Sequence, residues 1–271
     1  MLSGKRVLLT GAAQGIGRAL AERLSAAGAK LCLSDIDADR LHDLASNLDA
    51  VSAPADLRDP QQITGMVAAA EGALGGIDML ISNAGFAVGA MEGPCTASDD
   101  QWQDSWDVHV MAHLRASRLV LPGMRARGAG WLINVASAAG LLSQIGDAPY
   151  SASKHAAVSL AQSLAIEHGD EGIHVSVVCP LYVATPLLGY AEAAPDDRPH
   201  DRVLTPEQVA DVILKGVRQG RFLILPHPEA ESFFQRRAAD MDRWIEGMRR
   251  LRRGAFADGL PADLADLHRR I

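Results

Sequence analysis

The feature of this sequence that most constrains its fold is a regular alternation of short apolar runs with longer stretches of helical period. Runs suited to strands occur at Arg6–Thr10, Lys30–Ser34, Val51–Pro54, Met79–Ser82, Trp131–Ala136, His174–Cys179 and Phe222–Leu225. Most are nearly continuous in Val, Ile and Leu, which is typical of parallel strands buried on both faces. Helical patterns separate them at Ile16–Ala27, Ala38–Leu48, Gln61–Leu74, Asp99–Arg127, Ser151–His168 and Pro206–Gln219. Because crossovers between parallel strands are right-handed, the pattern predicts an α/β fold: a doubly wound, seven-stranded parallel sheet with helices on both faces.

The chain has no linker rich in Pro, Gly or Ser, so we expect one Rossmann-type domain over residues 1–226. A further helical pattern at Glu229–Leu251 predicts that residues 227–271 form a C-terminal helical extension of that domain. One face of this pattern is basic, which suits either a membrane-binding helix or, more commonly, a solvated face over a packed stripe; we expect the second. Two long loops, Gly85–Ala97 and Leu181–Leu204, are candidate binding segments.

Composition excludes several classes of protein. Lys and Arg total 26 against 33 for Asp and Glu, and a formal charge of −7 gives no electrostatic footprint for nucleic acid. The three cysteines, Cys32, Cys95 and Cys179, provide neither a disulfide framework nor a metal site. The first residues enter an apolar run without a signal-like region, and no run approaches the ~18 apolar residues of a membrane span. We therefore expect a cytoplasmic protein without a metal.

A glycine-rich turn follows the first predicted strand. It reads Thr10-Gly11-Ala12-Ala13-Gln14-Gly15-Ile16-Gly17 and leads directly into a helical pattern. Glycines let the backbone approach a pyrophosphate, whose negative charge is favoured by the free N–H groups and the dipole at a helix N-terminus. Such a turn alone is weak support for dinucleotide binding, because glycines also serve ordinary tight turns.

Asp35, at the end of the second predicted strand, strengthens this interpretation. A carboxylate there can accept hydrogen bonds from an adenosine ribose, although it could instead cap the helix that begins at Ala38. The same carboxylate would repel a 2′-phosphate, and we expect Arg40 to lie too far away to offset it. The sequence therefore favours NAD over NADP.

A second group of residues suits proton transfer. Tyr150 and Lys154 lie four apart on a helical pattern, so both side chains share one face, and a nearby ammonium would lower the pKa of a phenol. Ser137, at the end of the fifth predicted strand, would donate to a substrate oxygen at the carboxyl edge of the sheet. A tyrosine and a lysine at this spacing also occur by chance on helix surfaces, so the serine carries much of the weight.

These residues resemble the short-chain dehydrogenase/reductase family, in its form of about 250 residues. The family's motifs stand here, in order, as Thr10 to Gly17, Ser82-Asn83-Ala84-Gly85, Ser137, Tyr150 to Lys154, and Pro180-Leu181-Tyr182-Val183-Ala184-Thr185. The match runs from about Gly4 to Thr185 and more weakly to Leu225. Several motifs at matching intervals are far more specific than any one of them.

The resemblance implies roles for individual residues. Tyr150 is the general acid/base, Lys154 lowers its pKa and holds the nicotinamide ribose, and Ser137 orients the substrate oxygen. Asp56 contacts the adenine, Asn83 to Gly85 line the cofactor, and Val183 and Thr185 hold the carboxamide. The expected cofactor site comprises Gly11, Gln14, Gly15, Ile16, Gly17, Asp35, Ile36, Asp56, Leu57, Asn83, Ala84, Gly85, Tyr150, Lys154, Pro180, Val183 and Thr185. The expected substrate site comprises Ser137, Tyr150, Leu142, Tyr182 and Leu187.

The sequence departs from the family pattern at three places. His109 stands where most members have an asparagine that contacts a relay water, so it either keeps that water, makes activity unusually pH-dependent, or is a packed residue without a role. Ala136 replaces a non-catalytic serine. Leu181 replaces a glycine and cannot adopt positive φ cheaply, so the loop over the nicotinamide should differ in shape.

We therefore predict a reversible NAD-dependent hydride transfer between an apolar secondary alcohol, cyclic or aromatic in shape, and its ketone. The alternatives are a reductase of 3-oxoacyl thioesters, a dehydrogenase of cyclic dihydrodiols, and, from another class, a non-catalytic dinucleotide sensor. A basic patch near the pocket would favour the thioester reductase. The resemblance also implies a homodimer or homotetramer.

Overall fold

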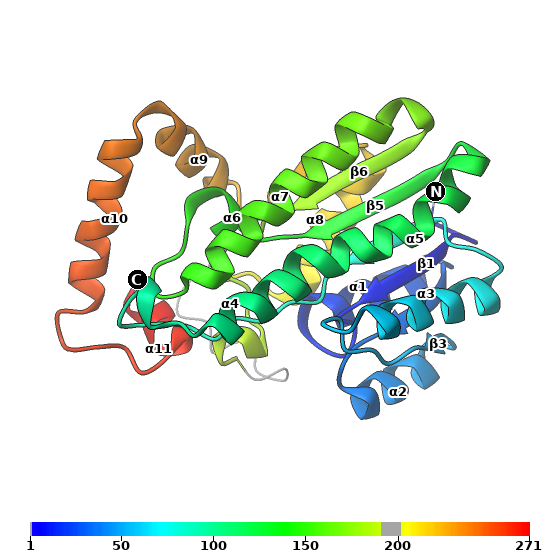
Figure 1. The fold of residues 1–271 in the computed structure, drawn as a ribbon, viewed down its shortest axis with the longest axis horizontal. Coiled ribbons are helices and arrows are strands. Elements are labelled where there is room, and N and C mark those ends of the chain that lie inside the picture. Colours follow the sequence, from blue (N-terminus) through cyan, green and yellow to red (C-terminus); the bar gives the residue numbers. More distant parts are fainter. Residues whose placement is uncertain (1, 191–201) are drawn as a thin grey trace.

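The computed structural model describes residues 2–190 and 202–271, and its centre is one parallel sheet of seven strands (Figure 1). The strand order is β3-β2-β1-β4-β5-β6-β7. The strands are β1 (Arg6–Thr10), β2 (Lys30–Ser34), β3 (Val51–Ser52), β4 (Met79–Ser82), β5 (Gly130–Val135), β6 (Ile173–Val178) and β7 (Leu223–Ile224). The order in which strands are added reverses between β1 and β4, since β2 and β3 lie on one side of β1 and β4 to β7 on the other. In folds of this kind, ligands bind beyond the carboxyl ends of the strands at that point.

The predicted α/β fold is confirmed, with differences at strand ends. β1, β2 and β4 coincide with their predicted ranges, whereas β5 and β6 each begin and end one residue earlier than predicted. β3 and β7 are shorter than predicted, because each lies at an edge of the sheet and pairs with one neighbour only. Apolar residues that flank these two short strands pack against the core and still bond to the neighbouring strand: Ala53 N donates to Leu33 O at 2.9 Å, and Phe222 O accepts from Val177 N at 2.7 Å.

Helices cover both faces of the sheet. The first core cluster packs α3 (Pro60–Leu74), α5 (Ala112–Arg127) and α7 (Ala148–His168) on one face, and the second packs α1 (Gly15–Ala26), α2 (Ala38–Asn47) and α8 (Pro206–Arg218) on the other. The inner sides of these helices are rich in Ala, Val and Leu, and burying such side chains is the main favourable contribution to folding. One layer of helices thus covers each face of the sheet, as expected for right-handed crossovers between parallel strands.

The predicted helix over residues 99–127 is three consecutive segments. α4 (Asp99–Trp106) passes into a π-helical turn, η2 (Asp107–Met111), which passes into α5. The backbone is right-handed helical on both sides of the turn. For this reason the sequence shows one continuous helical pattern here. Such π-helical turns are rare and often lie at functional sites.

The predicted single tail helix over residues 229–251 is wrong in its continuity. α9 (Glu229–Ala239) ends at Asp240, whose φ of −155° and ψ of 95° are extended, and α10 (Met241–Ala255) begins there. The Asp240 carboxylate accepts a hydrogen bond from Arg243 N at 2.9 Å, which caps the new helix. After α11 (Leu264–Arg270) the chain ends, and α9, α10 and α11 lie together at one end of the molecule (Figure 1).

Two shorter elements lie near the carboxyl edge of the sheet: α6 (Ala139–Leu142) and the 3-10 turn η4 (Pro186–Leu188). The predicted loop Leu181–Leu204 falls partly outside the described residues. Across the two described ranges, no helix combines the length and apolarity needed to cross a bilayer.

Candidate active site

The glycine-rich turn is folded tightly against the end of β4. Gly11 has a φ of +65°, and a Cβ on it would come within 2.6 Å of Ala84 Cα. The Asn83 side chain fastens the turn, because its Nδ2 donates to Thr10 O at 3.1 Å and to Gly11 O at 2.9 Å. A Cβ on Gly17 would overlap the Gly11 carbonyl oxygen, so Gly17 serves the packing of the helix on the turn. Glycine is required at both positions by close backbone approach.

The N-terminus of α1 faces the open side of this turn. Its capping residue, Gln14, makes no hydrogen bond from its side chain to the first turn, and that turn contains no acidic residue. The first N–H groups of the helix therefore keep the capacity to bind an anion. A Cβ on Gly15 would stand 3.1 Å from Thr185 Cγ2, so glycine keeps the passage between them open.

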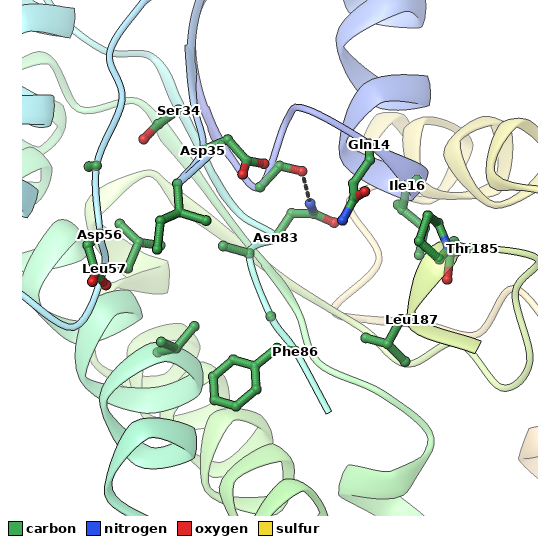
Figure 2. Close-up of a pocket in the computed structure, with 18 of the residues that line it drawn as sticks. Gln14, Ile16, Ser34, Asp35, Asp56, Leu57, Asn83, Phe86, Thr185 and Leu187 are labelled. Carbon is green, nitrogen blue, oxygen red and sulfur yellow. Dashed lines mark hydrogen bonds between the residues drawn. The ribbon is translucent and has the colours of Figure 1, made fainter. Parts of the chain in front are cut away.

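A groove of about 530 Å³ begins at this turn and follows the carboxyl edge of the sheet (Figure 2). The expected cofactor residues meet there: Gly11, Gln14, Gly15, Ile16, Asp35, Ile36, Asp56, Leu57, Asn83, Ala84, Gly85 and Thr185 all line it. Gly17 does not, for the reason given above. A long groove with a helix N-terminus in its wall fits the shape and charge of a dinucleotide.

Asp35 is held firmly in the wall of the groove. Its Oδ2 accepts a hydrogen bond from Ala13 N at 2.9 Å, and its Oδ1 accepts one from Asp37 N at 3.1 Å. The carboxylate thus joins the glycine-rich turn to the end of β2 and keeps lone pairs directed to the groove. Asp35 does not cap α2, which was the alternative role considered for it. The cap is Asp37, whose side chain accepts a hydrogen bond from Arg40 N.

Arg40 lies nearer to the glycine-rich turn than the sequence suggested. Its Nη1 donates to Gln14 Oε1 at 3.1 Å, although the residues are 26 positions apart. Arg40 Nε also lies 3.4 Å from Asp37 Oδ2. The expectation that Arg40 is out of reach was wrong, because its long side chain, on the first turn of α2, reaches Gln14 in the glycine-rich turn.

Asp56 lines the groove but already has a strong partner. Arg58 approaches it with Nε at 3.0 Å from Oδ1 and Nη2 at 2.7 Å from Oδ2, and its Nη1 reaches Asp104 Oδ2 at 3.1 Å. The hydrogen bonds from Arg58 lower the pKa of Asp56. This pairing was not evident from the sequence, and it leaves fewer lone pairs of Asp56 available to a ligand.

The expected acid/base residues meet at the far end of the groove. Tyr150 and Lys154 lie on one face of α7, with Lys154 Nζ 5.4 Å from the centre of the Tyr150 ring. Lys154 Nζ also donates to Val135 O at 3.2 Å, at the end of β5. Both residues are buried, as is Ser137, which lies two residues after the end of β5.

Burial dominates the acid–base properties of this pair. It raises the pKa of the Tyr150 phenol to about 12, while a hydrogen bond with the Ser137 hydroxyl acts in the opposite direction. It also lowers the pKa of Lys154 to about 8. The expectation that Lys154 lowers the pKa of Tyr150 is therefore not met in the protein alone, because removing both groups from water favours their neutral forms.

Asp147 connects the start of α7 to the loop after β4. Its Oδ1 accepts a hydrogen bond from Tyr150 N at 3.0 Å, and its Oδ2 accepts from Val88 N at 3.2 Å and Gly89 N at 3.0 Å. Burial raises the pKa of this carboxyl group. The sequence analysis missed Asp147, although an Asp three residues before a candidate tyrosine at a helix start is a recognisable cap.

His109 lies inside the π-helical turn and is completely buried. Its Nε2 accepts a hydrogen bond from Phe86 N at 3.2 Å, so Nδ1 carries the proton of the neutral ring. This Nδ1 lies 2.8 Å from Ser153 Oγ. Ser153 Oγ in turn donates to Tyr150 O at 3.0 Å. Burial holds the pKa of His109 well below 6.5. Both ring nitrogens thus bond to protein groups, which favours a positioning role over the pH-dependent one.

A second cavity, of about 360 Å³, opens beside Ser137 and Tyr150. The expected substrate residues Leu142, Tyr182 and Leu187 all line it. Much of its wall comes from the tail: Phe233, Trp244, Met248, Leu251, Leu264, Leu267 and Ile271. The amphipathic pattern of the tail was the available signal, but it did not show which surface the apolar stripe would cover.

A smaller cavity of about 100 Å³ lies between the other two. It is lined by Ser137, Tyr150, Lys154, Pro180, Val183 and Thr185, among others, and shares residues with both neighbours. Leu181 stands at its edge and is absent from the residues with positive φ, so the backbone does avoid the glycine-like conformation, as expected. In the described ranges, no group of three or more His, Cys, Asp or Glu residues is arranged to hold a metal.

Comparisons with known proteins agree with this geometry. A family model described as short chain dehydrogenase matches residues 5–196. A putative ketoacyl reductase of the monensin polyketide synthase from Streptomyces virginiae is 38% identical over 229 residues, which are 76% of this chain and 87% of that protein.

Solved structures match as well. A short-chain dehydrogenase/reductase from Burkholderia phymatum in complex with NAD superposes with a TM-score of 0.78 at 29% identity, covering 89% of this chain and 95% of that one. L-sorbose reductase from Gluconobacter frateurii, complexed with NADPH and L-sorbose, superposes with a TM-score of 0.72 at 30% identity, covering 79% and 89%. The groove thus corresponds to a fold that holds either dinucleotide.

Proposed function

Because this chain belongs to the short-chain dehydrogenase family, whose members bind a nicotinamide dinucleotide, we propose that it transfers a hydride between NAD and an apolar secondary alcohol or its ketone. One observation carries the proposal. Ser137 and Tyr150 line both the small cavity at the end of the dinucleotide groove and the apolar cavity beside it. A substrate oxygen between these two hydroxyl groups would lie next to the place where the nicotinamide fits.

The groove residues would hold the cofactor by charge and shape. The N-terminus of α1 would bind the pyrophosphate, and the fixed carboxylate of Asp35 would accept from the adenosine ribose. Lys154 would bind the nicotinamide ribose, while Val183 and Thr185 hold the carboxamide. The bound dinucleotide supplies the hydride chemistry.

Tyr150 would exchange a proton with the substrate oxygen. Since burial raises the pKa of the phenol to about 12, Tyr150 is protonated at neutral pH and is ready to act as an acid toward a ketone. In the direction of alcohol oxidation the phenolate must form, and positive charge at Lys154 favours it. Ser137 would donate to the same oxygen and hold it near the phenol.

NAD is the cofactor we propose over NADP. The Asp35 carboxylate lies where a 2′-phosphate would bring two further negative charges, and its two backbone hydrogen bonds prevent it from turning away. Arg40 provides one compensating charge at Gln14, but Asp37 pairs with that guanidinium.

The apolar wall of the second cavity supports an apolar alcohol, cyclic or aromatic in shape. The test measures reduced nicotinamide by absorbance, with NAD and with NADP, across aliphatic, cyclic and aromatic secondary alcohols. Tyr150→Phe should lower kcat roughly 100- to 10,000-fold and leave NAD binding unchanged, because only the proton donor is lost. Tyr182→Phe is the matched control, since it removes a phenol from the same cavity. Equal activity of Tyr150→Phe and Tyr182→Phe would contradict the assignment.

A second candidate, a reductase of 3-oxoacyl thioesters, is favoured by one observation. Helix α10, which contributes Trp244, Met248 and Leu251 to the substrate cavity, carries an exposed basic face with Arg249 and Arg253. That face could bind the phosphates of a carrier. The protein would then reduce a 3-oxoacyl coenzyme A. The KM for this substrate should rise in the double variant Arg249→Glu, Arg253→Glu, whereas the KM for an uncharged cyclic ketone should not change.

We further propose a cytoplasmic homodimer or homotetramer, as the sequence suggested. Size-exclusion chromatography with light scattering measures the assembly directly.

A further inference from the structure

Among the residues that the structure describes, the segment from Pro180 to Leu188 is the one stretch that borders all three cavities. Thr185, Pro186 and Leu187 line the dinucleotide groove, and Tyr182, Leu187 and Leu188 line the substrate cavity. The small cavity between them also takes part of its wall from this segment. A shift of its backbone would therefore alter cofactor and substrate contacts together.

His227, just after β7, holds the backbone at the start of this segment. Its Nδ1 accepts a hydrogen bond from Leu181 N at 3.1 Å, and its Nε2 donates to Tyr182 O at 2.9 Å. The histidine is only 2% exposed. One imidazole thus satisfies the N–H of one residue and the C=O of the next, groups that are costly to bury without partners.

The position of this bond explains how the segment tolerates Leu181. Asp49 and Ser143 are the only non-glycine residues with positive φ in the described ranges, so the backbone at Leu181 stays in an ordinary conformation. Its N–H nevertheless needs a partner, and the imidazole of His227 provides one from outside the segment.

His268, on α11, covers the side chains of the same segment. Its ring centre lies 4.5 Å from that of Tyr182, and its Nε2 lies 3.0 Å from the Tyr190 hydroxyl. The helix packs closely here, because a Cβ on Gly189 would stand 2.8 Å from Ala265 Cβ. His268 is also buried and lines the substrate cavity.

We propose that His227 and His268 are positioning residues that fix the shape of the 181–190 segment, His227 through its backbone and His268 through its tyrosines. Both lie beyond residue 196, where the family model ends, so this chain's own tail would set the geometry of its active-site loop. Their effect on turnover rests on the proposed function, but their effect on the segment does not.

The direct test is amide hydrogen exchange of residues 181–189, which needs neither cofactor nor substrate. His227→Phe should speed exchange there at least tenfold, because the loss of a buried hydrogen bond worth about 1.4 kcal/mol changes the opening equilibrium by that factor. His227→Asn should restore most of the protection, since an amide offers one acceptor and one donor. His42→Phe, an exposed histidine on α2, is the matched control.

Binding and kinetics form the second arm. By calorimetry, His227→Phe should weaken NAD binding roughly tenfold, whereas His268→Phe and Tyr190→Phe should mainly raise the KM for the alcohol. Unchanged exchange and NAD affinity in His227→Phe would overturn the proposal, as would a His227→Asn variant as impaired as His227→Phe. If His227→Phe does not fold, His227→Ala and Tyr190→Phe decide, and wild-type exchange of residues 181–189 in both variants refutes the proposal. Altered exchange without any turnover in the wild type would instead count against the proposed function alone.

Discussion

Replacing Asp35 by asparagine should change which dinucleotide the protein prefers. The substitution keeps the size of the side chain and removes its charge. One of the two backbone hydrogen bonds, from Ala13 N or Asp37 N, is lost, because an amide has a single acceptor oxygen. We expect a cost of about 1 kcal/mol in local stability and a modest loss of NAD affinity.

The magnitude of the change follows from the charge removed. A 2′-phosphate carries about −1.5 to −2, and a half-buried carboxylate within ~5 Å of it is repelled by about 2 to 3 kcal/mol at a dielectric between that of water and that of the protein surface. Removing that repulsion corresponds to roughly 30- to 150-fold in kcat/KM for NADP. Arg40, held at Gln14, would then contribute an attraction that the carboxylate had offset.

The assay compares kcat/KM for NAD and NADP in the wild type, in Asp35→Asn and in Asp39→Asn. Asp39→Asn is the matched control, because Asp39 is an exposed carboxylate in the first turn of α2, four residues from Asp35. We expect the NAD/NADP ratio to fall at least 30-fold in Asp35→Asn and to change less than threefold in the control. A wild type that prefers NADP, or equal effects of both substitutions, would refute the electrostatic explanation.

Three further predictions concern the buried polar groups around Tyr150. Burial lowers the pKa of Lys154 from 10.5 to about 8, so between these pH values Lys154 is protonated in the unfolded protein and neutral in the folded protein. The free energy of unfolding should therefore rise with pH from about 8 to 10.5, by on the order of 3 kcal/mol. Chemical unfolding at several pH values should show this rise in the wild type and not in Lys154→Met. Asp147→Ala should cost about 2 to 4 kcal/mol of unfolding free energy, because three backbone N–H groups lose their acceptor. A melting temperature equal to that of Asp43→Ala, an exposed control on α2, would contradict this. Because the pKa of His109 lies well below 6.5, the pH profile of kcat should show no inflection from this residue between pH 6 and 8, and a profile that moves in His109→Asn would refute its neutral state.

The sequence predicted the sheet well because buried parallel strands leave a strong local signal. Continuous apolar runs marked β1, β2 and β4 to the residue. The cofactor groove was predicted for the same reason. The position of its glycines and of Asp35 depends on the strand that each follows, and those strands could be recognised in the sequence. Predictions from the sequence were correct where a structural feature depends on residues close together in the chain.

What the sequence could not show depends on residues far apart in the chain. The tail was expected as one helix, and nothing in its pattern placed Trp244 over the catalytic cavity or His268 against Tyr182. Arg58, two residues after Asp56, was equally hidden, because whether two neighbours pair depends on side-chain directions in a loop. The raised pKa of Tyr150 reflects burial by the whole fold, which spacing on one helix does not contain.

The π-helical turn at Asp107–Met111 acts as a one-residue insertion in an otherwise continuous helix. Successive side chains of an α-helix are rotated by about 100°, so one additional residue between α4 and α5 rotates the side chains of α4 by about that angle relative to those of α5. Deleting a single residue here would let α4 and α5 join as an ordinary helix and would rotate α4 by about that angle relative to the sheet. His109 would then leave Phe86 and Ser153, and Asp104 would leave Arg58. Among variants of this chain, we therefore expect substitutions in the turn to be tolerated far more often than changes in its length.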